Sequence, residues 1–207
     1  MRRKLFPFAA LIAAVSFIPF SGYAEGGAVN LVKNPSFEEV APDGSPVNWI
    51  SRIRKHEKDP GKQATAQFKL TDDAQDGKKA ATIVAPESNP DRSLNMGEWY
   101  QDVEVKPNQQ YFLSVWIKSV QQRGGWPNAS VEQLTKSTDY AKNVPKDTKS
   151  LAELSDKGKS GEYNLHELMF KTGPDTEIIR ISLRFQDMGA GTVSFDNISL
   201  IELDKTK

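Results

Sequence analysis

The sequence predicts an all-β protein in which two antiparallel sheets pack face to face as a sandwich. Short segments rich in Val, Ile, Phe and Tyr recur along the chain, and apolar and polar side chains alternate within them. Clusters of Gly, Pro, Asn and Asp separate these segments. A period of two is typical of strands that bury one face, and no segment shows the pattern of a long amphipathic helix. Many short strands without long helices favour a sandwich.

Two strands show the alternation most clearly. Residues 110–119 and 178–186 each alternate apolar and polar or aromatic side chains. The expected inward sets are Tyr111, Leu113, Val115 and Ile117 in the first strand, and Ile179, Ile181, Leu183 and Phe185 in the second. The opposite faces then carry Trp116 in the first strand, and Arg180 and Arg184 in the second, because successive side chains in a strand point to opposite sides.

Further strands are expected over residues 64–70, 80–85, 103–105, 163–171 and 192–203. Residues 120–160 are polar and fit this pattern poorly, so they are interpreted as a long insertion with a short strand at 128–134 and a helical turn at 148–154. A loop of this length is often functional, and the alternative is a surface insertion without a function.

The chain begins like a secreted protein. Arg2, Arg3 and Lys4 precede an apolar run that ends at Phe20, and small residues lead up to Ala24. This layout predicts a signal peptide over residues 1–24 with cleavage before Glu25, and a secreted, extracellular or periplasmic location. The alternative is an uncleaved N-terminal anchor. No later segment is apolar enough for membrane insertion after cleavage.

Composition narrows the function classes. The chain has 27 basic and 27 acidic residues, and removal of the leader leaves it slightly acidic. Nucleic acid is therefore not an expected partner, because nucleic-acid binding needs a basic face. The chain has no cysteine, so neither disulfides nor thiolate metal sites stabilise it.

Three motifs carry a resemblance to a known family. They are NLVKNPSFEE at 30–39 with PVNW at 46–49, YQDVEVKP at 100–107 running into YFLSVWIK at 111–118, and GTVSFDNISL at 191–200. In this order they resemble the carbohydrate-binding modules of families 4, 9 and 22, within the galactose-binding-like group. The resemblance spans the chain after residue 24. It implies one domain over residues 25–207, a two-sheet antiparallel jelly roll, and first and last strands that lie side by side.

The resemblance also implies a structural calcium ion (Ca2+). Glu38 and Asp196 each follow a Phe in the first and last motifs, and the family places acids there as ligands. Asp76, in the turn Asp-Gly-Lys-Lys at 76–79, is the expected third ligand, with a backbone carbonyl beside it. Calcium takes six to eight oxygens of this kind. Glu39 replaces Glu38 if the register slips by one residue, and otherwise these acids cap turns or pair with lysine.

A poly- or oligosaccharide is the expected ligand, held in a groove on one sheet. Sugar rings stack on aromatic rings, and planar polar groups bind their hydroxyls. The expected groove residues from outward strand faces are Trp116, Arg180, Arg184, Gln186 and Glu167, and Trp99, Tyr100 and Trp126, expected in loops, form the rim. Trp49 is expected in the core. Trp116 instead packs under the 120–160 insertion if it binds nothing.

No catalytic motif is present, and an enzyme is not expected. The chain lacks a nucleophile elbow, a zinc-protease helix motif and a phosphate-binding glycine loop. A pair of carboxylates can hydrolyse a glycoside, and Glu167 is the acid to test for a hydrolase or lyase. The main alternative is a surface or matrix scaffold that binds protein partners, since one fold hosts many functions.

Overall fold

The computed structural model describes residues 29–53, 65–86, 97–123, 126–134, 150–155, 161–186 and 190–203. These residues form ten strands and, within the described ranges, no helix. The strands are β1 (Ile50–Ile53), β2 (Gln67–Thr71), β3 (Ala80–Ala85), β4 (Gly97–Glu104), β5 (Gln110–Arg123), β6 (Trp126–Leu134), β7 (Ser150–Ser155), β8 (Tyr163–Lys171), β9 (Ile178–Gln186) and β10 (Ala190–Leu203).

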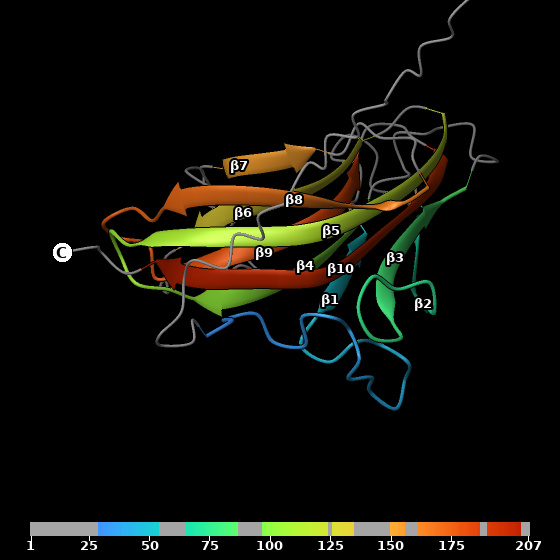
Figure 1. The fold of residues 1–207 in the computed structure, drawn as a ribbon, viewed down its shortest axis with the longest axis horizontal. Coiled ribbons are helices and arrows are strands. Elements are labelled where there is room, and N and C mark those ends of the chain that lie inside the picture. The colour runs from blue at the N-terminus through green and yellow to red at the C-terminus, as the bar shows by residue number, and fades with distance from the viewer. Residues whose placement is uncertain are drawn as a thin grey trace, which may run out of the picture.

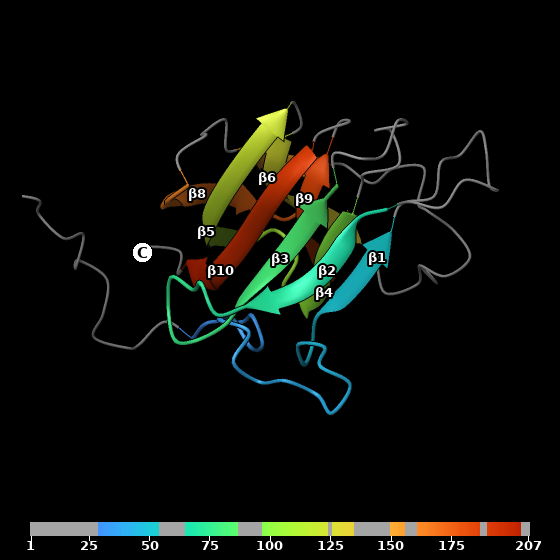
Figure 2. The same cartoon turned by 90° about the vertical axis from the view of Figure 1, so that its right-hand side faces the viewer.

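Two five-stranded sheets make up the sandwich (Figures 1 and 2). One has the order β1-β4-β9-β6-β7 and the other the order β2-β3-β10-β5-β8. All pairings between these strands are antiparallel. The predicted all-β, two-sheet architecture is therefore confirmed.

The core lies between the sheets and contains the predicted inward residues. All of these residues are completely buried. They are Tyr111, Leu113, Val115 and Ile117 of β5, and Ile179, Ile181, Leu183 and Phe185 of β9. Trp49 is buried as expected, and its ring centroid lies 5.1 Å from that of Phe37. Because the inward positions are filled, the alternate side chains of both strands point outward.

The N-terminal segment lies along the last strand as the resemblance implied, but it is not itself a strand, and the first strand, β1, belongs to the other sheet. The backbone N–H of Leu31 donates to the carbonyl of Leu200 at 2.9 Å, and that of Ile198 donates to the carbonyl of Pro35 at 3.0 Å. The Asn30 side chain adds two more bonds, one to the Ile198 carbonyl and one from the Leu200 N–H. This pairing brings the first and third sequence motifs together.

Two local predictions are corrected. Residues 97–104 form β4, so Trp99 and Tyr100 lie in a strand and not in a loop. The helical turn expected at 148–154 is the strand β7, which pairs with β6 inside the predicted insertion. Charged residues in β4 and the lack of regular alternation in β7 hide both strands from a search for apolar alternation. The predicted leader at 1–24 lies outside the described residues. Within the described residues, no helix is long and apolar enough to cross a membrane.

Candidate functional site

The outward face of the first sheet is polar and largely buried. Here it is called the polar face, and its side chains are Arg52 of β1, Glu98, Tyr100 and Asp102 of β4, Arg180, Ser182 and Arg184 of β9, and Asn128, Ser130 and Glu132 of β6. The registers align these residues in rows across the strands, so that Arg52, Glu98, Arg184 and Asn128 are successive neighbours. Charged residues seldom lie buried on an outer sheet face unless they are paired.

Ion pairs connect most of this face. Arg184 donates through Nε to Glu98 Oε2 at 2.8 Å and through Nη2 to Glu132, while Arg52 pairs with the other oxygen of Glu98. Arg180 holds Asp102 with two bonds of 2.7 and 2.8 Å. Burial would raise the pKa of Glu98, but the charges and hydrogen bonds of Arg184 and Arg52 outweigh it, so the pKa lies below its ordinary value. Glu98 is thus a fixed anion.

The accessible part of the polar face lies at β1 and β4. Ile50 is 55% exposed, and it pairs in register with the half-buried Tyr100. The Tyr100 ring contacts two guanidinium groups, with the Cζ atom of Arg180 at 4.1 Å and that of Arg52 at 5.2 Å from its centroid. The side chain of Asp102 is 41% exposed beside them. An apolar surface therefore adjoins charged hydrogen-bonding groups held in fixed positions.

Two serines are buried deeper in the same face. Ser130 and Ser182 face each other across β6 and β9, and they are 1% and 0% exposed. Neither hydroxyl has a hydrogen-bond partner among the described residues. A buried hydroxyl without a partner costs stability, so these positions are not optimised for the fold alone.

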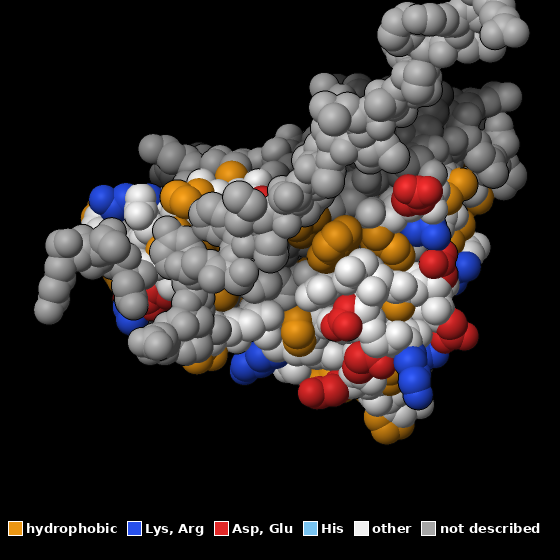
Figure 3. Space-filling model, in the orientation of Figure 1, with side chains coloured by type: hydrophobic (Ala, Val, Ile, Leu, Met, Phe, Trp, Pro, Cys, Tyr) orange, Lys and Arg blue, Asp and Glu red, His pale blue; other side chains and the backbone are white. Residues whose placement is uncertain are grey.

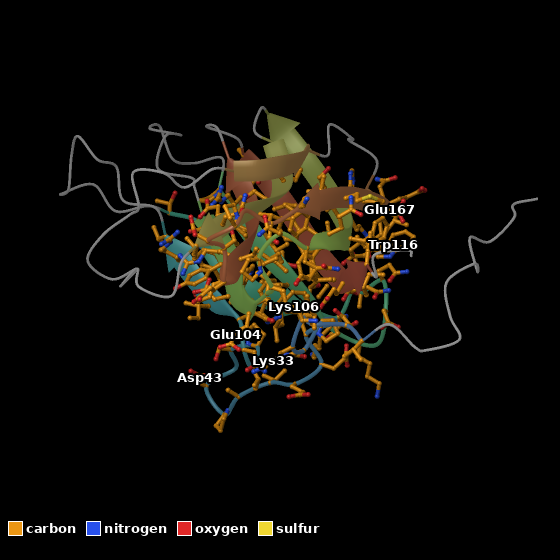
Figure 4. The ribbon with its side chains drawn as sticks, turned by 90° about the vertical axis from the view of Figure 1, so that its left-hand side faces the viewer. Lys33, Asp43, Glu104, Lys106, Trp116 and Glu167 are labelled. Atoms are coloured by element: carbon orange, nitrogen blue, oxygen red, sulfur yellow. The ribbon has the colours of Figure 1, made fainter. Side chains whose placement is uncertain are left out.

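The second sheet presents a different outward face. Here it is called the Trp116 face, and it consists of Phe112, Ser114 and Trp116 of β5 with Met169, Glu167 and Leu165 of β8, which pair in that order. Leu165 and Met169 are 44% and 60% exposed, and Trp116 is half-buried. Figure 4 shows Trp116 and Glu167 beside each other on one side of the sandwich. Figure 3 shows the molecule from the side of this sheet, where apolar side chains are interspersed with acidic and basic ones.

These positions correct the predicted groove. Trp116 and Glu167 belong to one sheet, whereas Arg180 and Arg184 belong to the other, so they lie on opposite outer faces and cannot line one groove. Trp99 is 4% exposed and points into the core, where its ring lies edge-on to Phe68 at 5.1 Å, so it is not a rim residue.

For the last two predicted groove residues, the structure describes the backbone alone. Trp126 and Gln186 pair in register at the end of β6 and β9, but their side chains lie outside the described residues. The residues that the sequence reasoning missed are mainly Glu98, Asp102, Asn128 and Glu132. The alternation of Glu98, Tyr100 and Asp102 with Trp99, Gln101 and Val103 is the signal that would have found the first two.

Of the three predicted calcium ligands, Asp76 lies in the turn before β3, and Glu38 and Asp196 contact backbone N–H groups of that turn. Asp196 Oδ2 accepts from the backbone N–H of Gln75 at 2.6 Å and of Asp76 at 2.9 Å. Glu38 Oε1 accepts from the N–H of Lys78 at 2.6 Å and of Lys79 at 2.7 Å. The exposed Glu39 instead uses its backbone N–H and carbonyl to bind the Asn34 side chain. Of these two acids, Glu38 is the one whose carboxylate contacts the turn.

The carboxylates of Asp76 and Asp196 at this turn lie close enough to repel each other. Burial raises the pKa of Asp196 to about 6, against backbone hydrogen bonds that lower it, and the nearby Asp76 raises it further. Asp76 accepts a bond of 2.9 Å from the Ser36 hydroxyl. No group of three acidic, histidine or cysteine side chains among the described residues is placed to hold a metal ion, and Glu38, Asp76 and Asp196 are no exception. The residues fit a calcium ion only if backbone carbonyls of the turn complete its coordination, which is common for calcium.

Comparisons with known proteins agree on the fold. No family model and no curated protein matches the sequence. Among solved structures, a family 16 carbohydrate-binding module aligns with TM-score 0.55 and 18% identity over 84% of this chain and all of its own. A family 61 module in complex with β-1,4-galactotriose aligns with TM-score 0.53 and 20% identity, over 85% of this chain and all of its own.

Two further neighbours are a xylan-binding domain and a much longer tailspike chain. The family 22 xylan-binding domain of Paenibacillus barcinonensis Xyn10C has TM-score 0.54 and 14% identity, over 88% of this chain and all of its own. A tailspike of bacteriophage CBA120 has TM-score 0.60 and 13% identity over 84% of this chain, which spans only 21% of the tailspike chain. The described sandwich is thus a jelly roll of the carbohydrate-binding-module type.

Proposed function

We propose that this chain is a secreted, non-catalytic carbohydrate-binding protein that holds a poly- or oligosaccharide on its polar face. The observation that carries the proposal is the accessible surface at β1 and β4, where exposed Ile50 adjoins Tyr100, Arg52 and Asp102. A sugar ring has an apolar side and an edge of hydroxyls. The first fits Ile50 and Tyr100, and the second fits the guanidinium and carboxylate groups. The fold of the neighbours, of which one binds xylan and one galactotriose, supports this ligand class.

The charges of the polar face support a binding role without catalysis. A glycosidase needs a carboxylic acid whose pKa is raised, so that it can protonate the leaving oxygen. The pKa of Glu98 is instead lowered, and both of its oxygens are held by arginines. A carboxylate fixed in this way orients neighbouring donors and gives up no proton.

Calorimetric titration with xylohexaose and β-1,4-galactotriose tests the proposed ligand class. Tyr100→Ala and Ile50→Ala are expected to weaken binding by about tenfold each, the equivalent of about 1.4 kcal/mol. Val40→Ala is the matched control, because Val40 is a similarly exposed aliphatic residue (43%) in a separate β-bridge near the N-terminus. Unchanged affinity in both polar-face variants would place the ligand elsewhere. Release of reducing ends on long incubation would contradict the non-catalytic role.

A structural calcium ion at the acidic turn is the second part of the proposal. Glu38, Asp76 and Asp196 come from three distant parts of the chain and gather at one turn. The first and last motifs flank this turn, so an ion there would tie the N-terminal segment and β10 to β3. A bound cation would also offset the mutual repulsion of Asp76 and Asp196.

Thermal melting of metal-stripped protein with and without added calcium tests this site. Calcium at about 100 times its dissociation constant is expected to add about 2.7 kcal/mol to the free energy of unfolding. Asp196→Ala is expected to remove this gain. Asp72→Ala is the control, because Asp72 is an exposed acid of the same turn that pairs with Lys79. Identical melting curves for stripped and calcium-loaded wild type would exclude the ion.

A further inference from the structure

The Trp116 face has features that packing within this chain does not use. The Glu167 carboxylate is exposed and makes no hydrogen bond or ion pair to any described residue. It pairs in register with Ser114, and this polar row lies between the Trp116–Leu165 row and the Phe112–Met169 row. Same-face neighbours along a strand are about 7 Å apart. One aromatic platform and one unpaired carboxylate are therefore within reach of a single small ring.

The turn at residues 73–76 is bonded to the residues next to Trp116 on one side. In the next row, Lys118 donates through Nζ to Asp73 Oδ2 at 2.7 Å, and the Tyr163 hydroxyl donates to the Asp73 carbonyl at 2.7 Å. Asp196, the cross-strand neighbour of Trp116 on β10, accepts from Gln75 and Asp76. Side chains of β5, β8 and β10 thus hold the turn against the sheet, and all three belong to positions next to Trp116.

The size and composition of this face decide between possible occupants. Its apolar rows are interrupted by the Ser114–Glu167 row, and Lys118 and Tyr163 end them on one side. A stable protein interface buries about 800 Å² on each partner around a core depleted in charge. A sugar ring needs only one aromatic platform and a few acceptors for its hydroxyls. The pattern matches the smaller ligand.

We infer that the Trp116 face is a second saccharide-binding surface, separate from the polar face and on the opposite sheet. One sugar ring stacks on Trp116 beside Leu165, and the Glu167 carboxylate accepts hydrogen bonds from its hydroxyls. This inference rests on the proposed saccharide ligand but concerns residues that the polar face does not use. A protein carrying both surfaces would bind separate polysaccharide chains on its two sides.

Calorimetric titration with the same two probes separates the surfaces. Wild type is expected to show two binding sites per chain, and Tyr100→Ala is expected to weaken the polar-face site about tenfold and leave the other unchanged. In the Tyr100→Ala background, Trp116→Ala is expected to remove the site that Tyr100→Ala leaves unchanged, and Glu167→Gln to weaken that site by about tenfold. Glu104→Gln is the matched control, since Glu104 is an exposed glutamate at a distance from Trp116 and Glu167 in Figure 4. Glu167→Gln changes an exposed residue, so it keeps the test valid if Trp116→Ala fails to fold.

The failures of the two proposals have different signatures. Residual binding in Tyr100→Ala that neither Trp116→Ala nor Glu167→Gln changes would overturn the second surface and leave the polar face intact. Loss of all binding in Tyr100→Ala alone would do the same. Absence of binding of both probes to wild type would overturn the proposed ligand class, and the second surface with it. A dimer that Trp116→Ala dissociates would show that the face is a protein interface and would also overturn the inference.

Discussion

Ser182→Ala is expected to stabilise the protein, which is unusual for a change in the middle of a central strand. Ser182 is fully buried in β9, between Tyr100 on β4 and Ser130 on β6, and its hydroxyl has no partner among the described residues. An unpaired buried hydroxyl costs about 1–3 kcal/mol. Its removal leaves a space of only one oxygen atom, so the free energy of unfolding is expected to rise by about 1 kcal/mol and the melting temperature by about 2–4 °C.

Ser194→Ala is the matched control for this measurement. Ser194 is a buried serine of β10, but its hydroxyl lies 2.8 Å from the Thr82 hydroxyl. Removing that hydrogen bond leaves Thr82 unpaired and is expected to lower the free energy of unfolding by about 1 kcal/mol or more. Urea and thermal unfolding of both variants give effects of opposite sign if the reasoning holds. A loss of stability in Ser182→Ala as large as that in Ser194→Ala would show that the Ser182 hydroxyl has a partner and would refute it.

Three further predictions concern the turn, the polar face and the leader. Gly77→Ala is expected to lower the free energy of unfolding by about 1–2 kcal/mol, because Gly77 has φ +70° and an added Cβ would lie 2.6 Å from Glu38 Oε1; a melting temperature equal to that of wild type would contradict this. Glu98→Gln is expected to cost about 3 kcal/mol at pH 7, because it removes a buried charge that pairs with both Arg52 and Arg184. Since the folded-state pKa of Glu98 is lowered, the stability from its charge is lost as pH falls below about 4.5, so acid titration should narrow the gap between variant and wild type; a constant gap would argue against the ion pairs. Mass spectrometry of secreted protein is expected to find Glu25 at the N-terminus, and a chain starting at Met1 would exclude cleavage.

Alternation along single strands predicted the faces of β5 and β9 but not the sheets to which they belong. Trp116 and Arg184 both point outward, as the period of two requires. Their sheets differ because β5 pairs with β10 and β8, whereas β9 pairs with β4 and β6. These pairings join residues far apart in sequence, and no local pattern encodes them. A groove assembled from outward residues of unpaired strands was therefore wrong in its geometry.

The acidic turn and β4 show the two limits of reading motifs. Glu38, Asp76 and Asp196 were grouped only by the family resemblance; in the structure Asp76 lies in the turn whose backbone N–H groups donate to Glu38 and Asp196, but the three carboxylates do not form a cluster that could hold a metal ion. Strand β4 was missed because it contains Glu98 and Asp102, and charged residues in a short segment suggest a loop. In the fold, arginines of β9 neutralise both acids, and this compensation is visible only after the strands are paired.

The place of β10 determines when this protein can fold. It is the last described strand in sequence, yet it lies in the middle of its sheet, between β3 and β5. It also holds the N-terminal segment and carries Asp196. Until it leaves the ribosome, β2 with β3 and β5 with β8 are separate hairpin-like halves with open edges, and contacts this distant in sequence form slowly. The sandwich therefore closes only after β10 has been synthesised, and until then the growing chain depends on the cell to keep its exposed strands apart.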